Sequence, residues 1–223
     1  HHELPPAVFG SGNPRRTIPY IFSRQDIEGL VQAAIHPRFR GLRRDTYSTF
    51  FALLACTGLR LSEAIKLRCD DITPDGLVIR CTKFRKSRLV PLHETARDRL
   101  QCYLERRRGY APFDDHVFVS MTGKPLRIDS INTAFHIAAR KISLPCAPQR
   151  PRPTPHSLRH SFAVRALETC PDGRDRITQH MLALSTYLGH AKVADTYWYL
   201  TATPELMRDI AERSETFVKR EQL

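Results

Sequence analysis

Apolar residues recur at helical spacing through most of this chain, and one short region breaks that pattern. Tyr47, Phe50 and Leu54 fall at intervals of three or four residues, so they share one face of a helix expected over residues 45–57. Residues 77–81 are instead apolar and β-branched, which is typical of a strand. The sequence therefore predicts a mostly α-helical fold with a small antiparallel β-sheet, in the α+β class.

Capping residues, glycines and prolines predict where the other helices, strands and loops begin and end. Ser23 can cap a helix that runs through Ala34, and Gly58 can stop the helix that precedes it. Residues 88–92 are the expected partner strand of 77–81, with a basic hairpin over 82–87. Residues 145–155 contain five prolines and are expected to form a loop, because proline does not continue a helix. Further helices are expected over 61–67, 94–108, 128–141, 157–169, 174–188 with some break, 193–200 and 205–217.

The charge of the chain favours a polyanionic partner. Its 223 residues include 35 Lys and Arg against 23 Asp and Glu, for a formal net charge of +12. Such a balance attracts nucleic acid over long range, although a protein that merely happens to be basic remains an alternative. No apolar run approaches the roughly 20 residues that cross a bilayer. We therefore expect a cytoplasmic protein that does not associate with membranes.

Cysteine and histidine spacing gives no indication of a metal site. The six cysteines are widely spaced and include no Cys-x-x-Cys pair, so we expect them to be reduced. His156 and His160 stand four residues apart, which is metal-ligand spacing, but the glutamate and third ligand of a metalloprotease helix are absent. We expect no metal and no cofactor, and we interpret His160 as a packed core histidine.

Arg60 stands at an expected helix junction, just after Gly58. A helix start offers free amide donors and the positive end of the dipole, so an anion beside Arg60 would meet both. Glu63 follows three residues later and can hold the guanidinium. The alternative is an ordinary Arg–Glu pair within one helix, which contributes little if exposed.

Two further segments carry polar groups suited to a phosphate. His156 and Arg159 lie three positions apart, hence on one helix face. His190 follows a glycine, and Tyr199 comes nine residues after it. Tyr197 is a rival of Tyr199, but helical positions two apart point about 200° away from each other, so only one can face a pocket. The spacing from His190 favours Tyr199.

The order and spacing of these pieces resemble the tyrosine recombinases, also called phage-type integrases. The resemblance rests on Arg60 with Glu63, Lys83 ahead of Val90-Pro91-Leu92, His156-x-x-Arg159, Leu188-Gly189-His190 and Tyr199. It runs from about residue 19 to residue 217. It implies the tyrosine recombinase catalytic-domain fold and a site-specific recombinase or integrase. Such an enzyme breaks and rejoins DNA through a 3′-phosphotyrosyl intermediate, without metal or ATP.

The resemblance also implies a role for each residue. Tyr199 would be the nucleophile. Arg60 and Arg159 would clamp the phosphate oxygens, which suits the bidentate geometry of a guanidinium. His156 would assist removal of the tyrosine proton, and His190 would hydrogen-bond the phosphate.

The expected hairpin supplies the remaining candidates. Lys83 would donate a proton to the departing 5′-oxygen, and it is preferred to Lys86 because it lies eight residues before Pro91. Lys86, Arg85 and Arg88 are candidates for contacts with the DNA backbone. Glu63 would orient the guanidinium of Arg60 without contacting the phosphate itself.

The resemblance sets expectations for organisation and partners. Residues 1–19 read as a basic proline-rich lead-in, 20–217 as the catalytic domain with a C-terminal helix at about 204–217, and 218–223 as a tail. That helix is expected to pack either on its own domain or on a neighbouring subunit. The N-terminal core-binding domain usual in the family is expected to be missing from a fragment of a longer recombinase. The implied partners are double-stranded DNA and further copies of the chain, as a tetramer on DNA and a monomer when free.

Two rival functions remain open at this point. The first is a DNA-binding module of the same fold that has lost catalysis. The second is a metal-dependent nuclease, which would need a carboxylate cluster that the matched positions do not offer.

Overall fold

The fold is known from a computed structural model. It describes residues 19–35, 41–80, 87–111, 114–142, 144, 151–169, 174–190 and 192–199. The helices in these ranges are α1 (Arg24–Ala33), α2 (Leu42–Thr57), α3 (Leu61–Lys66), the short 3₁₀ helix η1 (Cys69–Asp71), α4 (Glu94–Arg108), α5 (Ile128–Ala139), α6 (Pro155–Glu168), α7 (Arg174–Leu188) and α8 (Ala194–Tyr197).

Three short strands form one antiparallel sheet. They are β1 (Ile72–Thr73), β2 (Gly76–Ile79) and β3 (Arg88–Val90), in the order β1-β2-β3. Leu77 pairs with Ile72 on one side and with Val90 on the other. The inward-facing side chains of Leu77, Ile79 and Val90 are buried, which anchors the sheet to the helical core.

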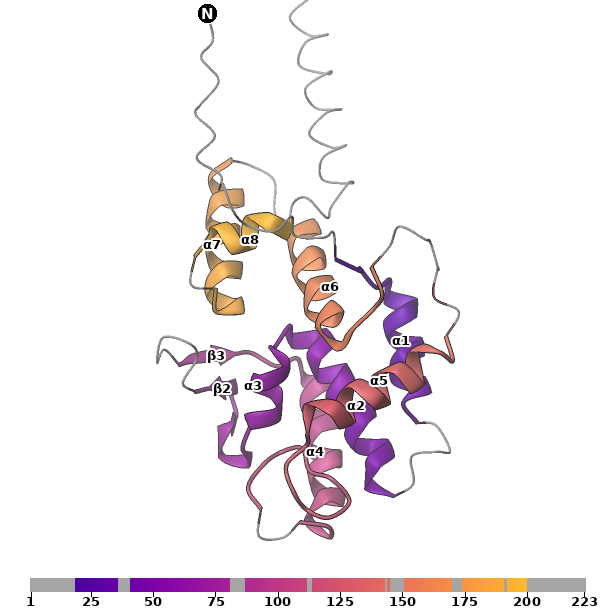
Figure 1. The fold of residues 1–223 in the computed structure, drawn as a ribbon. Helices are drawn as coiled ribbons and strands as arrows, with labels where there is room; N and C mark the ends of the chain where they lie inside the picture. Colours follow the sequence, from indigo (N-terminus) through magenta and orange to yellow (C-terminus); the bar gives the residue numbers. More distant parts are fainter. Residues whose placement is uncertain are drawn as a thin grey trace, which may run out of the picture.

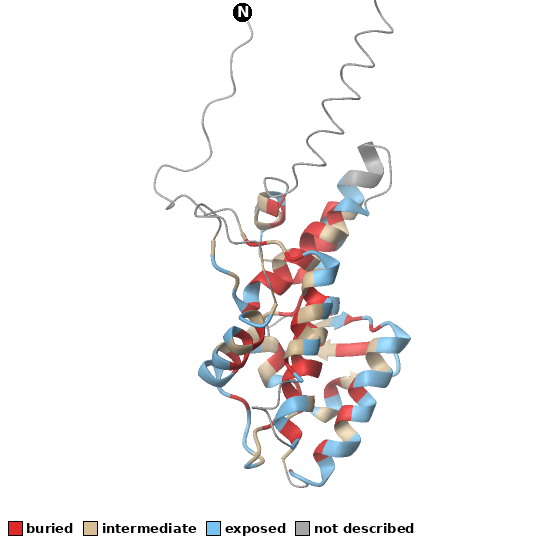
Figure 2. Ribbon diagram, turned by 90° about the vertical axis from the view of Figure 1, so that its right-hand side faces the viewer, coloured by how far each residue is buried: buried red, intermediate tan, exposed pale blue. Residues whose placement is uncertain are grey.

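Helix α2 lies at the centre of the molecule and contacts α1, α3, α4, α5 and α6 (Figure 1). Its aromatic residues Phe50 and Phe51 are fully buried and pack edge-to-face against Phe118 and Phe135. Buried residues follow the inner helices while exposed ones follow the outer faces (Figure 2). A second cluster of buried apolar residues joins α6, α7 and Tyr199. This second cluster positions the region after α7 against α6.

Local signals explain where several helices begin and end. Ser23 and Asp26 form a reciprocal capping box at the start of α1, with hydrogen bonds of 3.1 and 2.9 Å. Gly58 ends α2 at a φ of 60°, a left-handed conformation that glycine adopts without a Cβ penalty. Pro155 occupies the first turn of α6, where its missing N–H would have no partner in any case.

The predicted fold class is confirmed, and most of the expected helices are present. Helix α6 begins at Pro155, so the expected loop ends one residue earlier than predicted. Helix α7 runs from Arg174 to Leu188 as one element, without the break expected there. Helix α8 is shorter than predicted, and strand β1 was not predicted. The expected helix over 205–217 lies outside the described residues.

Within the described residues, no helix combines the length and the apolar character needed to cross a membrane.

Candidate active site

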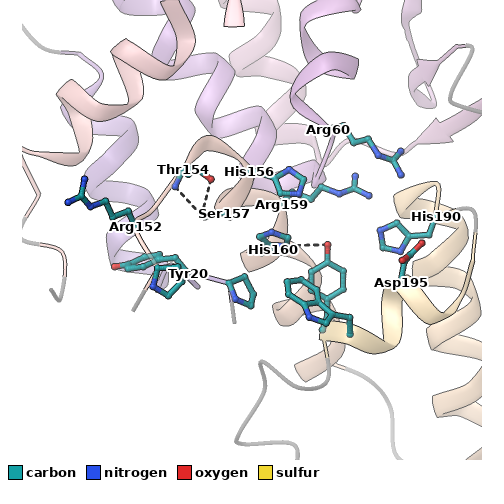
Figure 3. Close-up of a pocket in the computed structure, with 14 residues that line it drawn as sticks. Tyr20, Arg60, Arg152, Thr154, His156, Ser157, Arg159, His160, His190 and Asp195 are labelled. Carbon is teal, nitrogen blue, oxygen red and sulfur yellow. Dashed lines mark hydrogen bonds between the residues drawn. The ribbon is translucent and has the colours of Figure 1, made fainter. Parts of the chain in front are cut away.

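One pocket of about 570 Å³ gathers most of the polar residues that the sequence singled out. Its lining includes Arg60, His156, Arg159, His190 and Tyr199. They come from the start of α3, from α6, and from the segment that follows α7. Figure 3 shows Arg60, His156, Arg159 and His190 around one space. The two arginines end on the same side of this space as the His190 ring (Figure 3). The pocket therefore combines fixed positive charge, imidazoles and a phenol.

Arg60 is the N-cap residue of α3 and is held on two sides. Its guanidinium donates to Oε1 of Glu63 at 2.8 Å and to the carbonyl of Gly189 at 2.7 Å. The Arg60 backbone N–H donates to the other Glu63 oxygen at 2.9 Å. A guanidinium carries five N–H donors, so these contacts orient the group and leave donors for an anion.

Glu63 holds a second arginine as well. Arg88 donates to both Glu63 oxygens at 3.0 and 2.8 Å, and its Nε donates to the carbonyl of Tyr187 at 2.7 Å. Burial would raise the pKa of Glu63, but the hydrogen bonds from Arg88 and Arg60 outweigh it and lower the pKa to about 2. Glu63 is therefore a largely enclosed carboxylate that accepts hydrogen bonds from two guanidinium groups.

Arg88 was expected to contact the DNA backbone, but in the structure its side chain points into the protein. Its side chain is only 10% exposed, and its guanidinium faces Glu63 and the end of α7. Arg88 instead supports Glu63 and, through it, Arg60.

Arg159 is buried in α6 and reaches across to two other segments. It donates to the carbonyls of Gly58 at 2.6 Å and Leu188 at 2.8 Å. Burial lowers the pKa of Arg159 to about 10, which still leaves it charged at neutral pH. Because both contacts are to fixed backbone groups, the guanidinium is held ready before any anion arrives.

His190 follows Gly189 at the end of α7 and faces the same pocket. Its Nδ1 lies 2.7 Å from Oγ1 of the buried Thr196, so Nε2 is the nitrogen that can meet a ligand. Burial and the charges of Arg159 and Arg60 lower the pKa of His190 to about 4. The ring is therefore neutral at neutral pH.

The Tyr199 hydroxyl meets a histidine that sequence reasoning assigned to packing. His160 Nδ1 lies 3.3 Å from the Tyr199 oxygen (Figure 3). The interpretation of His160 as a core histidine was wrong, since it is half-buried and lines the pocket. His156 was expected near this hydroxyl, but the ring nitrogen placed there belongs to His160. The i,i+4 spacing of the two histidines was the available signal, because it puts both on one face of α6.

The two neighbouring tyrosines occupy different environments. Tyr199 is 3% exposed and lines the pocket, whereas Tyr197 is 50% exposed. Lys83, Arg85 and Lys86 lie outside the described residues.

One cluster of metal-ligand type lies elsewhere in the described part of the chain. Asp114, Asp115 and His116 bring their ligand atoms within 4.8 Å of one another. Arg68 pairs with Asp115, and Arg107 lies 3.7 Å from Asp114, so arginines already balance these carboxylates. None of the three lines the pocket that contains Tyr199.

A mostly helical fold with a small sheet, in which a tyrosine faces two arginines and several histidines, defines the class of tyrosine recombinase catalytic domains. The fold agrees with this class. The crystal structure of the XerH site-specific recombinase bound to palindromic difH substrate in a post-cleavage complex matches 89% of this chain and 54% of that one, with a TM-score of 0.68 and 20% identity.

The sequence comparisons place the chain within a family. The model of the phage integrase family matches residues 22–205, and the chain belongs to this family. It is 39% identical over 96% of its length to y4rB of Sinorhizobium fredii (strain NBRC 101917 / NGR234), whose name describes an integrase/recombinase. It is 30% identical over 94% of its length to the tyrosine recombinase XerD of Halalkalibacterium halodurans. The chain spans 71% of the first relative and 64% of the second.

Proposed function

We propose that this chain carries the catalytic site of a DNA strand-exchange enzyme in which Tyr199 attacks a DNA phosphate. The attack forms a 3′-phosphotyrosyl bond and releases a 5′-hydroxyl, and the reverse reaction rejoins a strand. The observation that carries the proposal is the buried Tyr199 hydroxyl in one pocket with the guanidinium groups of Arg60 and Arg159.

The proposed division of roles follows from the contacts. Arg60 and Arg159 are tethered to backbone carbonyls, so their guanidinium groups can bind the non-bridging phosphate oxygens without moving. His190 offers Nε2 to the same phosphate, because its Nδ1 faces Thr196. His156 lines the pocket beside Arg159 and can donate or accept a further hydrogen bond there. Lys83 is proposed as the donor of a proton to the leaving 5′-oxygen, on the basis of its position in the sequence.

Double-stranded DNA is the proposed substrate. The formal charge of +12 favours a polyanion, and the structurally similar Tn1549 transposon integrase was solved in complex with circular intermediate DNA. Strand exchange joins ends from two duplexes, so we also propose that several copies of the protein assemble on DNA. The division into a lead-in at 1–19 and a catalytic domain at 20–217 is part of the same proposal.

A covalent capture experiment tests the function without a known target site. The chain is incubated in EDTA with a pool of nicked duplexes whose sequence is randomised on both sides of the nick. A short 5′-hydroxyl product leaves after cleavage, so the protein–DNA adduct accumulates and survives SDS. Sequencing of the captured DNA then identifies the preferred site.

Two tyrosine variants make a matched pair for this assay. Tyr199→Phe is expected to abolish the adduct, and Tyr197→Phe is expected to retain it, because Tyr199 lines the pocket whereas Tyr197 is exposed and does not. An adduct that persists in Tyr199→Phe would overturn the choice of nucleophile. DNA binding without any adduct from the unaltered chain would favour the inactive DNA-binding module. Cleavage that EDTA abolishes would favour a metal-dependent nuclease.

A further inference from the structure

A ring nitrogen of His160 contacts the Tyr199 hydroxyl, with Nδ1 3.3 Å from the phenol oxygen. The contact joins residues 39 positions apart in the chain, so it depends on how the segment after α7 packs on α6. The second buried cluster provides that packing, since it includes Leu167 of α6, Leu188 of α7 and Tyr199 itself. The His160–Tyr199 contact is therefore part of the folded framework of the pocket.

The His160 ring is held from two further sides. His156, one turn earlier on α6, packs edge-to-face at 4.5 Å between ring centroids, and Trp198 packs at 5.3 Å. The start of α6 is itself fixed, because Thr154 and Ser157 form a capping box there. A ring held by two aromatic neighbours keeps Nδ1 directed at the hydroxyl, as a positioned proton acceptor requires.

The charges around His160 keep its imidazole neutral, so one ring nitrogen keeps a lone pair for the Tyr199 hydroxyl, and they also lower the proton affinity of the ring before DNA binds. Burial and the charges of His156, Arg159 and His190 lower the pKa of His160 to about 3. Arg60 and Asp195 face the same pocket from α3 and α8. A bound phosphate diester would bring one negative charge beside Arg159 and Arg60. That charge offsets theirs and raises the proton affinity of the ring at the time of attack.

We propose that His160 positions the Tyr199 hydroxyl and accepts its proton during attack on the DNA phosphate. This inference rests on the proposed function. The Tyr199 oxygen forms a bond to phosphorus while its proton moves to His160 Nδ1. The bond from phosphorus to the 5′-oxygen breaks, and that oxygen takes a proton from Lys83. In the rejoining step the 5′-hydroxyl attacks, and the protonated His160 returns its proton to the departing phenolate.

The matched variants for a test are His160→Asn and His156→Asn. An asparagine carbonyl oxygen lies close to the position of Nδ1, so it can accept a hydrogen bond but does not take up a proton at these pH values. His156→Asn makes the same change one turn earlier on the same helix. The measurement is the single-turnover rate of adduct formation between pH 6 and pH 9.5, on a nicked site recovered from the randomised pool.

The expected result is a difference in the slope of the pH profile. The unaltered chain keeps a nearly flat profile, because His160 is neutral across this range. His160→Asn is about 100-fold slower at pH 7, the lower end of what a general base contributes. Its rate then rises about tenfold per pH unit, as the phenol ionises unaided toward its ordinary pKa of about 10. His156→Asn changes the height of the profile and keeps it flat.

A second substrate tests whether His160 acts on the nucleophile or on the leaving group. Sulfur in place of the bridging 5′-oxygen gives a leaving group that needs no proton. The defect of His160→Asn is expected to persist on this substrate, because His160 acts on the nucleophile. Restoration of the rate by sulfur would place His160 at the leaving group and overturn the inference.

Other outcomes also decide the question. A flat profile for His160→Asn, or a rate within threefold of the unaltered chain, refutes the role of His160. A rising profile in His156→Asn alone would move that role to His156. Because the slope is measured within each variant, partial loss of folded protein changes only the height, and His160→Gln serves if the asparagine variant does not fold. No adduct from the unaltered chain refutes the proposed function itself.

Discussion

Replacement of Glu63 by glutamine should destabilise the protein strongly at neutral pH and much less in acid. The Glu63 carboxylate accepts hydrogen bonds from Arg60 and from Arg88, and its side chain is only 9% exposed. Glutamine keeps the shape but removes the negative charge between two guanidinium groups. The variant therefore leaves both positive charges without their balancing anion.

The size of the effect follows from the pKa of Glu63. It falls from 4.5 to about 2 in the folded protein. Each pKa unit corresponds to about 1.36 kcal/mol, so the shift of about 2.5 units contributes about 3 kcal/mol to the free energy of unfolding at pH 7. A pKa that is lowered on folding stabilises the protein above the unfolded value of 4.5, and this stability is lost as pH falls toward 2. At pH 3 somewhat less than half of this contribution remains.

Urea unfolding at pH 7 and pH 3 measures this dependence. Glu63→Gln should lose about 3 kcal/mol at pH 7, and its difference from the unaltered chain should shrink by about half at pH 3. Glu28→Gln is the control, because Glu28 forms an exposed pair with Arg24 on α1 and should change stability by less than about 1 kcal/mol. A loss below about 1 kcal/mol at pH 7, or an equal loss at both pH values, would refute the reasoning.

Two further substitutions test the framework around the pocket. Gly58→Ala should cost about 1 to 3 kcal/mol in thermal or urea unfolding, because φ is 60° and an added Cβ would lie 2.5 Å from Phe162 Cδ1. Gly109→Ala, with nothing nearer than 3.8 Å, should change stability little, and equal effects at the two glycines would contradict this explanation. Arg159→Lys should slow adduct formation roughly 100- to 1,000-fold, because an ammonium does not reproduce the planar fork that meets two carbonyls and, in the proposed reaction, a phosphate. A rate within tenfold of the unaltered chain would show that charge alone is sufficient.

Local sequence signals predicted most of the helices and the hairpin strands. Ser23 and Gly58 act through the backbone of adjacent residues, so their effects can be read without knowledge of the rest of the fold. The β2–β3 pairing could also be predicted, since both strands follow one another along the chain. The short strand β1 carries only two residues, which is too few for a periodicity to indicate.

The sequence indicated which residues gather in one pocket but not which of their side chains contact one another. The residue order from Arg60 to Tyr199 indicated which groups belong together, and the pocket contains the five of them that the structure describes. The sequence did not indicate that Arg88 contacts Glu63 or that His160 contacts Tyr199. Both side chains suit several roles, and the sequence does not show which long-range neighbour each one meets.

The sequence by itself determined the helical pattern, the basic charge and the order of the phosphate-binding groups, because each depends on residue type and local spacing. Only the tertiary structure decided that Arg88 donates to Glu63 and to Tyr187, 25 and 99 positions away, and that His160 meets Tyr199, 39 positions away. These contacts form where α6, α7 and the sheet pack together. A hydrogen bond requires its two atoms to lie within about 3 Å in a suitable direction, and only the packing of remote elements sets that geometry.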